Sequence, residues 1–274
     1  MASSSITVVL ILGLFGIVVA SGKGKQWQED ESKEGPVPGF NYGEVDEWGS
    51  KDPSFAACSK GDRQSPIDIN TYEVVVNNTL ETLERDYTVK NATLSTQGTV
   101  IGVLFPGRKG GLKIDGKTYK LAQFHFHAPS EHFLNGVQYA AELHQVHTAK
   151  DGSRAVVGVL FKHGPPSPYI NMMMPQLKEL AKTPCPGNHT TWTVITEFKS
   201  SFLRKWPRNY YRYHGSLTTP PCDENVLWSV LTEVKTISKE QIEALKAPLC
   251  DVNKNNARPT QPLNDRKVFK YELN

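Results

Sequence analysis

The stretch Gln123–His147 reads QFHFHAPSEHFLNGVQYAAELHQVH and carries five of the eight histidines of the chain. Both of its ends, Leu121–His127 and Tyr139–His147, are short and rich in aromatic and β-branched residues, which is typical of strands. The connection between them contains Asn135-Gly136, a turn-forming pair. We therefore expect two strands that pair as neighbours in one sheet.

The histidines of these two strands fall on a common face. Side chains alternate between the two faces of a strand, so His125 and His127 share one face, while Phe124 and Phe126 point to the other, into the core. If the strands pair, His144 reaches the face that holds His125 and His127. Three imidazoles would then converge on one point.

Three neutral imidazoles with an open fourth position form the ligand set of catalytic rather than structural zinc. Gln123 and Glu142 precede His125 and His144 by two residues, so each could accept the second N–H of a ligating ring. A lone His-x-His on a strand is more often incidental, but a third histidine with two such partners favours a metal site. The remaining histidines are interpreted as hydrogen-bonded structural residues (His132, His147) or as surface and loop residues (His163, His189, His214).

Strands dominate the rest of the chain. The sequence predicts a single domain of the α+β class with a large, mostly antiparallel, twisted central β-sheet and short peripheral helices. Helices are expected at Pro175–Lys182 and at Ser238–Lys246, where Ser238 and Gln241 form a capping box. The further expected strands are Thr99–Phe105, Ala155–Phe161, Trp192–Phe198 and Val226–Val234.

The N-terminus differs from the remainder in composition. Ile6–Ala20 is an almost unbroken apolar run, shorter than the roughly 20 residues that a membrane span needs. Residues 1–21 are therefore interpreted as a signal peptide, with a short membrane anchor as the alternative, although no Lys or Arg precedes the run. Residues 22–39 are polar and predicted to be a flexible lead-in, and residues 40–274 form the domain.

The predicted secretory route agrees with other features. Four widely spaced cysteines without a CxxC pair indicate one or two disulfides rather than a metal site. Three Asn-x-Thr sequons are candidate glycosylation sites, at Asn77, Asn91 and Asn188. We expect a secreted, extracellular protein with no stable membrane span after cleavage; a vacuole or a plastid reached by the secretory route are alternatives.

The charge balance limits the possible partners. Among 274 residues, 31 Lys and Arg face 28 Asp and Glu, a formal net charge of +3. This excess is too small to indicate nucleic acid or an acidic membrane as a partner. The sequence does not specify an oligomeric state.

Several separate motifs resemble the α-type carbonic anhydrase family. They are QSPIDI at 64–69, the histidine block, YHGSLTTPPC at 213–222 followed by Trp228, and NNARPTQPL at 255–263. The resemblance runs from about Tyr42 to the C-terminus. The sequence APSEH after His127 resembles the plant branch, which also includes dioscorin-type and nectarin-type proteins.

The resemblance implies a zinc enzyme, a carbonate dehydratase that hydrates carbon dioxide reversibly to bicarbonate and a proton. His125, His127 and His144 would hold Zn²⁺, with Gln123 and Glu142 as their partners. Thr218 would accept a hydrogen bond from zinc-bound hydroxide and donate one to Glu131, because an ionised carboxylate can only accept. The pocket for carbon dioxide would be formed by Val146, Val156, Leu217, Thr219, Val226 and Trp228.

The chain departs from the family at the proton-relay position. Fast members carry a histidine there, whereas this chain has Thr99, which does not titrate near neutrality. Tyr42 resembles a residue that orders water in the cavity, but a phenol with a pKa of about 10 is a poor relay. We therefore expect proton release to limit turnover and small imidazole buffers to accelerate it.

The family also implies a disulfide between Cys58 and Cys222, next to the Thr218 loop. Cys185 and Cys250 have no counterpart, and their pairing stays open between a second disulfide and free or intermolecular thiols. Two other readings compete with the enzyme. One is a secreted storage or binding protein on the same fold, and the other is a zinc hydrolase of esters, for which no HExxH or GxSxG motif is present.

Overall fold

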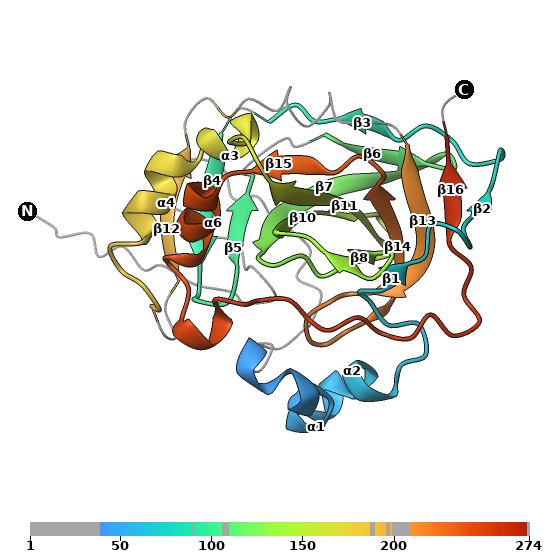
Figure 1. Ribbon diagram of the computed structural model, residues 1–274, viewed down its shortest axis with the longest axis horizontal. Coiled ribbons are helices and arrows are strands. Elements are labelled where there is room, and N and C mark those ends of the chain that lie inside the picture. Colours follow the sequence, from blue (N-terminus) through green and yellow to red (C-terminus); the bar gives the residue numbers. More distant parts are fainter. Residues whose placement is uncertain are drawn as a thin grey trace, which may run out of the picture. The chain divides into compact units, whose positions relative to one another are not determined.

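The computed structural model describes residues 39–89, 91–105, 110–186, 190–195, 198 and 209–272 (Figure 1). The predicted signal peptide, the lead-in before Gly39, and the predicted sites Asn188 and His189 lie outside these residues. Phe40–Asn274 is a compact unit, and all that follows concerns this unit.

One large sheet forms the centre of the unit. Neighbouring strands of this sheet pair antiparallel, with three parallel exceptions: β11 with β14, β11 with β15, and β16 with β2. The sheet is therefore mixed but mostly antiparallel, as predicted. Its main path runs through β12 (Thr191–Ile195), β4 (Ala92–Thr96), β5 (Ile101–Leu104), β7 (Lys117–His127), β10 (Ala141–Thr148), β11 (Arg154–His163), β14 (Glu224–Leu231), β13 (Tyr210–Ser216), β16 (Phe269–Tyr271) and β2 (Val75–Val76).

Smaller strands complete the sheet structure. β15 (Lys235–Ile237) joins β11, and β6 (Gly111–Ile114) lies between β7 and β3 (Glu84–Asp86). A separate sheet contains β1 (Asp68–Ile69), β8 (Phe133–Leu134) and β9 (Val137–Gln138). β8 and β9 are joined by Asn135-Gly136, both of which have positive φ, as a tight hairpin turn requires.

The helices are short. They are η1 (Tyr42–Glu47), α1 (Trp48–Lys51), η2 (Pro53–Phe55), α2 (Ala57–Lys60), α3 (Pro168–Asn171), α4 (Met174–Leu180), α6 (Lys239–Lys246) and η3 (Asp251–Asn253). The predicted capping box of α6 is confirmed: Gln241 N donates to Ser238 Oγ at 3.3 Å, and Ser238 N donates to Gln241 Oε1 at 3.2 Å. Within the described residues, no helix has the length and apolar character to cross a membrane.

Several predicted boundaries were wrong. The strand expected at Val226–Val234 ends at Leu231, and Val234 lies in the connection to β15. The strand expected at Trp192–Phe198 runs only to Ile195 among the described residues. β13 was missed altogether, because six of its seven residues are buried and the polar–apolar alternation that marks a half-exposed strand is therefore absent.

The large sheet is covered on both faces. On one face, Leu143 and Phe124 pack with residues of α4 and α6 such as Leu177 and Ile242. On the other face, Trp228 belongs to a second apolar cluster with residues of β10, β11 and β14. The histidines discussed below lie on the side of this second cluster.

His147 is a buried neutral residue of the first face. Its Nδ1 lies 3.1 Å from the carbonyl oxygen of Ala155, and its Nε2 lies 2.9 Å from the hydroxyl of Tyr87. Burial lowers the pKa of His147 from 6.5 to about 4, partly opposed by the hydrogen bond to Ala155. The interpretation of His147 as a hydrogen-bonded structural residue is confirmed, and His163 and His214 are exposed.

This buried histidine predicts a stability loss in acid. The unfolded chain binds a proton at His147 below pH 6.5, whereas the folded chain does so only below about pH 4, so stability falls as the pH falls through this window. At pH 4.5 the loss attributable to this residue is about 2.5 kcal/mol. Urea unfolding at pH 7 and pH 4.5 should show a smaller difference for His147→Gln than for the wild type. The exposed control His163→Gln should lose as much unfolding free energy between pH 7 and pH 4.5 as the wild type. An equal loss in all three proteins would contradict the prediction.

Candidate metal centre

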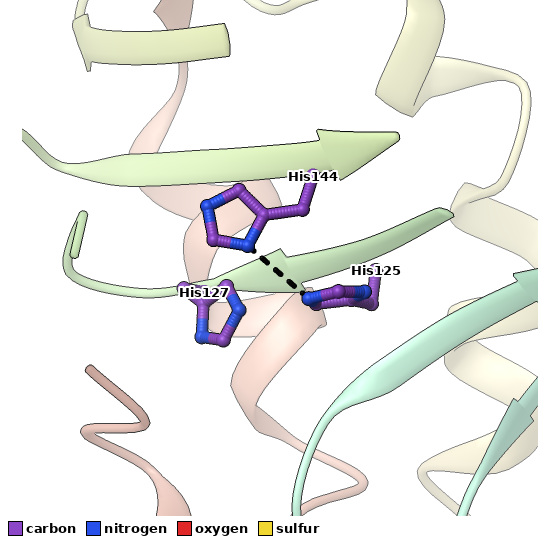
Figure 2. Close-up of side chains that lie close together, drawn as sticks. All are labelled: His125, His127 and His144. Carbon is purple, nitrogen blue, oxygen red and sulfur yellow. Dashed lines mark hydrogen bonds between the residues drawn. The ribbon is translucent and has the colours of Figure 1, made fainter. Parts of the chain in front are cut away.

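Three histidines meet on one face of the sheet (Figure 2). His125 and His127 come from β7, and His144 comes from the neighbouring strand β10, where it pairs directly with His125. Phe124 and Phe126 point to the opposite face and are buried there, as the alternation predicts. One nitrogen from each of the three rings lies within 4.8 Å of the others.

The spacing of these nitrogens fits a tetrahedral metal ion. With Zn–N bonds of about 2.0–2.1 Å, two nitrogens of a tetrahedral zinc site lie about 3.3 Å apart. His144 Nδ1 lies 3.2 Å from His125 Nε2, the pair joined by the dashed line in Figure 2. The Nε2 atom of His127 is buried and has no hydrogen-bond partner among the described residues, as expected for a ligand atom reserved for a cation. The donor set therefore fits zinc.

The second nitrogen of each ring faces an oxygen. Such contacts fix the tautomer, so that the lone pair lies on the nitrogen that faces the other rings. The sequence indicated two of these oxygens but missed the third, a backbone carbonyl. The three contacts are His125 Nδ1 with Gln123 Oε1 at 2.9 Å, His144 Nε2 with Glu142 Oε1 at 2.9 Å, and His127 Nδ1 with the carbonyl of Asn256 at 2.6 Å.

The environment keeps these imidazoles neutral. Burial lowers the pKa of His127 to about 3, with the neighbouring His144 as a second cause. Burial also lowers the pKa of His144, and burial and the other two rings lower the pKa of the half-buried His125. At neutral pH a metal ion would therefore meet free lone pairs and would displace no protons.

Glu142 is held in place by several donors. Its Oε2 accepts from the backbone N–H groups of Glu131 at 2.9 Å and His132 at 2.8 Å, and its Oε1 lies 2.8 Å from His132 Nδ1. Burial alone would raise the pKa of Glu142, but His132 and His144 hold it well below its usual range. His132 Nε2 in turn lies 2.7 Å from the hydroxyl of Tyr213. Because its nitrogens are engaged, His132 supports Glu142 rather than forming a second metal site with it.

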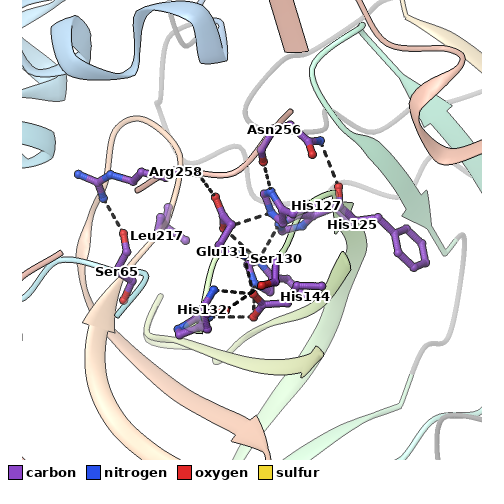
Figure 3. Close-up of polar contacts among 12 residues, drawn as sticks. Ser65, His125, His127, Ser130, Glu131, His132, His144, Leu217, Asn256 and Arg258 are labelled. Carbon is purple, nitrogen blue, oxygen red and sulfur yellow. Dashed lines mark hydrogen bonds and ion pairs between the residues drawn. The ribbon is translucent and has the colours of Figure 1, made fainter. Parts of the chain in front are cut away.

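Glu131 lies between Arg258 and His127 (Figure 3). Its Oε1 accepts from Arg258 N at 2.9 Å. Its Oε2 has no hydrogen-bond partner among the described residues and lies 3.4 Å from His127 Nε2 and 3.8 Å from His144 Nδ1. Burial raises the pKa of Glu131 well above its usual range, against a hydrogen bond with Thr218 that lowers it. A divalent cation at the histidines would also favour the ionised carboxylate.

The apolar residues that the sequence indicated as a substrate pocket gather beside the histidines. Trp228 lies with its ring 4.8 Å from the ring of His144. Thr219 is buried next to Thr218. The remaining residues all belong to the second apolar cluster or pack against it: Val146, Val156, Leu217 and Val226.

Tyr42 and Thr99 occupy the edge of the site. The ring of Tyr42 lies 6.4 Å from that of His127, and burial, then the charge of Glu131, raises its pKa well above 10. Thr99 is half-buried, and its carbonyl accepts from Asn256 Nδ2 at 3.1 Å. Neither residue offers a group that titrates near neutrality.

The four cysteines form two disulfides. Cys58 pairs with Cys222, with an S–S distance of 2.05 Å, as the resemblance implied. Cys185 pairs with Cys250 at 1.98 Å, which the sequence had left open. Of the predicted glycosylation sites, Asn91 is exposed and Asn77 is half-buried with its Oδ1 accepting from Thr79 N at 2.9 Å; Asn188 is not described.

Known proteins share this architecture. The chain is 37% identical over 277 residues to alpha carbonic anhydrase 7 of Arabidopsis thaliana, covering 98% of this chain and 97% of the relative. It is also 37% identical to dioscorin dioA3 of Dioscorea japonica, covering 82% of this chain and 81% of the relative. Among solved structures, that of dioscorin complexed with ascorbate has a TM-score of 0.78 at 35% identity, covering 83% of this chain and 93% of that one.

A family model described as eukaryotic-type carbonic anhydrase matches residues 43–272, which include the three histidines, both disulfides and the Thr218 loop. The chain therefore belongs to the alpha carbonic anhydrase family.

Proposed function

We propose that the protein is a zinc-dependent carbonic anhydrase that catalyses the reversible hydration of carbon dioxide to bicarbonate and a proton. The observation that carries the proposal is the histidine cluster, in which two ligand nitrogens already lie 3.2 Å apart. When bound, zinc supplies a Lewis acid that lowers the pKa of a water molecule to about 7, which is the value for carbonic anhydrase itself.

The residues around the histidines would hold this geometry during turnover. Gln123, Glu142 and the carbonyl of Asn256 each restrain one ring through its second nitrogen. The rings are neutral and buried or half-buried, so they can remain ligands across the neutral pH range. These restraints avoid rearrangement of the site at each cycle.

Thr218 and Glu131 would orient the nucleophile. An ionised carboxylate can only accept hydrogen bonds, so the hydroxyl of Thr218 would donate its hydrogen bond to Glu131. The oxygen of Thr218 is then left as an acceptor facing the reacting oxygen. Glu131 is itself fixed by Arg258 N at 2.9 Å.

The apolar wall would accept carbon dioxide. The substrate has no hydrogen to donate, so a surface formed by residues such as Val146, Val156 and Trp228 can hold it without competing for the polar groups. The same wall would exclude ordered water from the place where the substrate sits.

Proton export would be the slow step. Thr99 replaces the family's relay histidine, and Tyr42 is too weak an acid in its buried position. An external buffer would therefore carry the proton.

The similarity to dioscorin favours a second candidate function, a storage or binding protein on the same fold. The neighbouring dioscorin structure contains ascorbate, so this role would predict ascorbate binding with little catalysis. All three histidines, Glu131 and Thr218 are present here, which supports catalysis. Zinc content separates the two functions, since a storage protein need not retain the metal.

We also propose that the protein enters the secretory pathway and is glycosylated on the way. The two disulfides support an oxidising compartment, and of the two sequons that the structure describes, the exposed Asn91 is better placed than Asn77 to carry a glycan.

The first prediction concerns the metal. Wild-type protein should contain about one zinc per chain and hydrate carbon dioxide in a stopped-flow assay, whereas His144→Ala should lose both because only two ligands remain. The exposed control His163→Ala should retain both. Stoichiometric zinc without hydration would point to other zinc chemistry, and absence of zinc even after adding it back would favour storage or binding.

The second prediction concerns Thr218. Thr218→Val should keep zinc but lower kcat/KM for hydration by roughly 100-fold, because the orienting hydroxyl is lost. Thr218→Ser, which keeps the hydroxyl, should retain most of the activity. Equal activity of the valine and serine variants would contradict the role of the hydroxyl.

The third prediction concerns the proton. In weak buffer, imidazole should raise the turnover of the wild type at saturating carbon dioxide but leave kcat/KM almost unchanged, since proton export follows the chemical step. Thr99→His should raise turnover without imidazole and respond less to it. A wild-type turnover that is high and indifferent to imidazole would reveal another relay.

A further inference from the structure

The segment of residues 250–258, here called the strap, connects the periphery of the fold to the metal centre. It follows α6 and runs along one side of the sheet towards β16, in red in Figure 1. At its start, Cys250 is bonded to Cys185. At its end, Arg258 Nη2 donates to the carbonyl of Cys58 at 2.7 Å.

The last three residues of the strap include two that contact the site (Figure 3). The carbonyl of Asn256 accepts from His127 at 2.6 Å, and Arg258 N donates to Glu131. The side chain of Asn256 fastens the strap to β7 and its end, since its Oδ1 accepts from Ala128 N at 2.8 Å and its Nδ2 donates to the carbonyl of Phe126 at 3.3 Å. The position of His127 thus depends on the position of the strap.

The start of the strap is packed tightly against Gly98. Cys250 N donates to the carbonyl of Gly98 at 3.0 Å, and Asn253 Nδ2 donates to the same oxygen at 2.8 Å. A Cβ atom on Gly98 would come within 2.6 Å of Cys250 Sγ, so the disulfide itself occupies the space that the glycine leaves. Asn253 Oδ1 also accepts from Tyr42 N at 2.9 Å, next to the metal centre. Movement of Cys250 would therefore disturb two hydrogen bonds near the site: its own bond to Gly98, which precedes Thr99, and the bond between Asn253 and Tyr42.

The two disulfides differ in their access to solvent. Cys222 is fully buried and Cys58 half-buried, whereas Cys185 is exposed and Cys250 half-buried. Cys185 also lines a cavity of about 580 Å³ whose wall includes Lys246. A small thiol can approach the Cys185 sulfur from this side.

The cavity has charges of both signs. Lys254 forms an ion pair with Asp251 at 2.7 Å, which neutralises both. Lys246 instead contacts a neutral oxygen, Asn255 Oδ1, at 3.2 Å. Glu243 also lines the cavity, so the cavity as a whole is not positively charged and only the part near Lys246 is. Lys246 can attract an anionic thiol and stabilise a thiolate near the disulfide.

We propose that Cys185–Cys250 is a reduction site for a small anionic thiol, and that its opening loosens the strap and weakens the retention of zinc by His127. The part about zinc rests on the proposed function; the part about reduction does not.

The exchange follows ordinary thiol–disulfide chemistry. The thiolate attacks the sulfur of the exposed residue Cys185, the S–S bond breaks, and Cys250 leaves as a thiolate. A second thiol attacks the mixed disulfide at the sulfur of the first, releasing Cys185 as a thiolate. Two thiols are thereby oxidised to one disulfide, two electrons pass to the protein, and the protons of the two thiols end on Cys185 and Cys250 or in solvent.

Loss of the crosslink would act on the metal through the carbonyl of Asn256. The disulfide joins positions 65 residues apart, so its removal frees the start of the strap from the segment after α4 that carries Cys185. A displaced carbonyl no longer restrains the His127 ring. Loss of such a partner typically weakens metal affinity by roughly 10- to 100-fold.

The reduction site is tested first on the intact protein by labelling. The protein is treated with increasing glutathione, alkylated, and mapped by mass spectrometry. Cys185 and Cys250 should be labelled at concentrations at which Cys58 and Cys222 are not. Lys246→Gln should slow reduction by glutathione but not by uncharged 2-mercaptoethanol, while the matched control Lys239→Gln, on the same helix but away from the cavity, should behave as wild type. Simultaneous labelling of both pairs, or no labelling of Cys185, would overturn the proposal.

The effect on the metal is tested by zinc release to a chromogenic chelator. Release should be about 10-fold faster after selective reduction and in Cys185→Ser/Cys250→Ser, and glutathione should not accelerate it further in that variant. Hydrogen exchange provides a readout without metal. The backbone amides at positions 250 and 253 should lose protection in the variant, while the amide of Leu143 in β10 should not. Unchanged zinc release with a loosened strap would overturn the link to His127. A protein that binds no zinc would overturn the proposed function instead, and leave the labelling result standing.

Discussion

The pairing of β7 with β10 is the constraint on which the candidate metal centre depends. It sets His144 opposite His125 and Glu142 opposite His127, so that ligands and their hydrogen-bond partners share one face. Side chains alternate with a period of two along a strand. A slip of β10 by one residue would therefore move His144 to the face covered by the helices and bring Leu143 to the face that holds the other two histidines. The buried Leu143 opposes such a slip, since it would have to leave the apolar core for the face that holds the histidines. The register that builds the core therefore also builds the site.

Two buried carboxylates flank the histidines and experience opposite environments. Glu142 accepts from two backbone N–H groups and lies next to two imidazoles, those of His132 and His144, which favour its ionised form despite burial. Glu131 has one backbone donor, and one of its oxygens is left without a partner in the described part of the chain. Both oxygens of the first carboxylate have donors within the protein, so it needs no cation. Burial outweighs the hydrogen bonds that favour the anion of the second, and a cation at the histidines would add to them.

The sequence predicted the parts of this site that depend on local periodicity. The shared face of His125 and His127 follows from strand alternation, and the capping box of α6 follows from residues three apart. It could not predict the contribution of Asn256, because the acceptor is a backbone carbonyl that any residue could supply. The bond between Cys185 and Cys250 stayed open, because two cysteines 65 residues apart in the sequence reveal nothing about their distance in space. A whole strand, β13, was missed because burial on both faces removes the alternation.

The order in which the site assembles follows from the mixed topology of the sheet. The three histidines lie on neighbouring strands that are close in the sequence, whereas the wall beside them requires β11 to pair in parallel with β14, bringing Val156 opposite Trp228 across a long stretch of chain. Contacts between near segments form before those that close long loops. The ligand strands can thus form while the pocket is still open. A chain emerging during synthesis would present these histidines to the compartment in which it folds before it encloses them. Any metal that they take up would therefore come from that compartment rather than from the one in which the protein works.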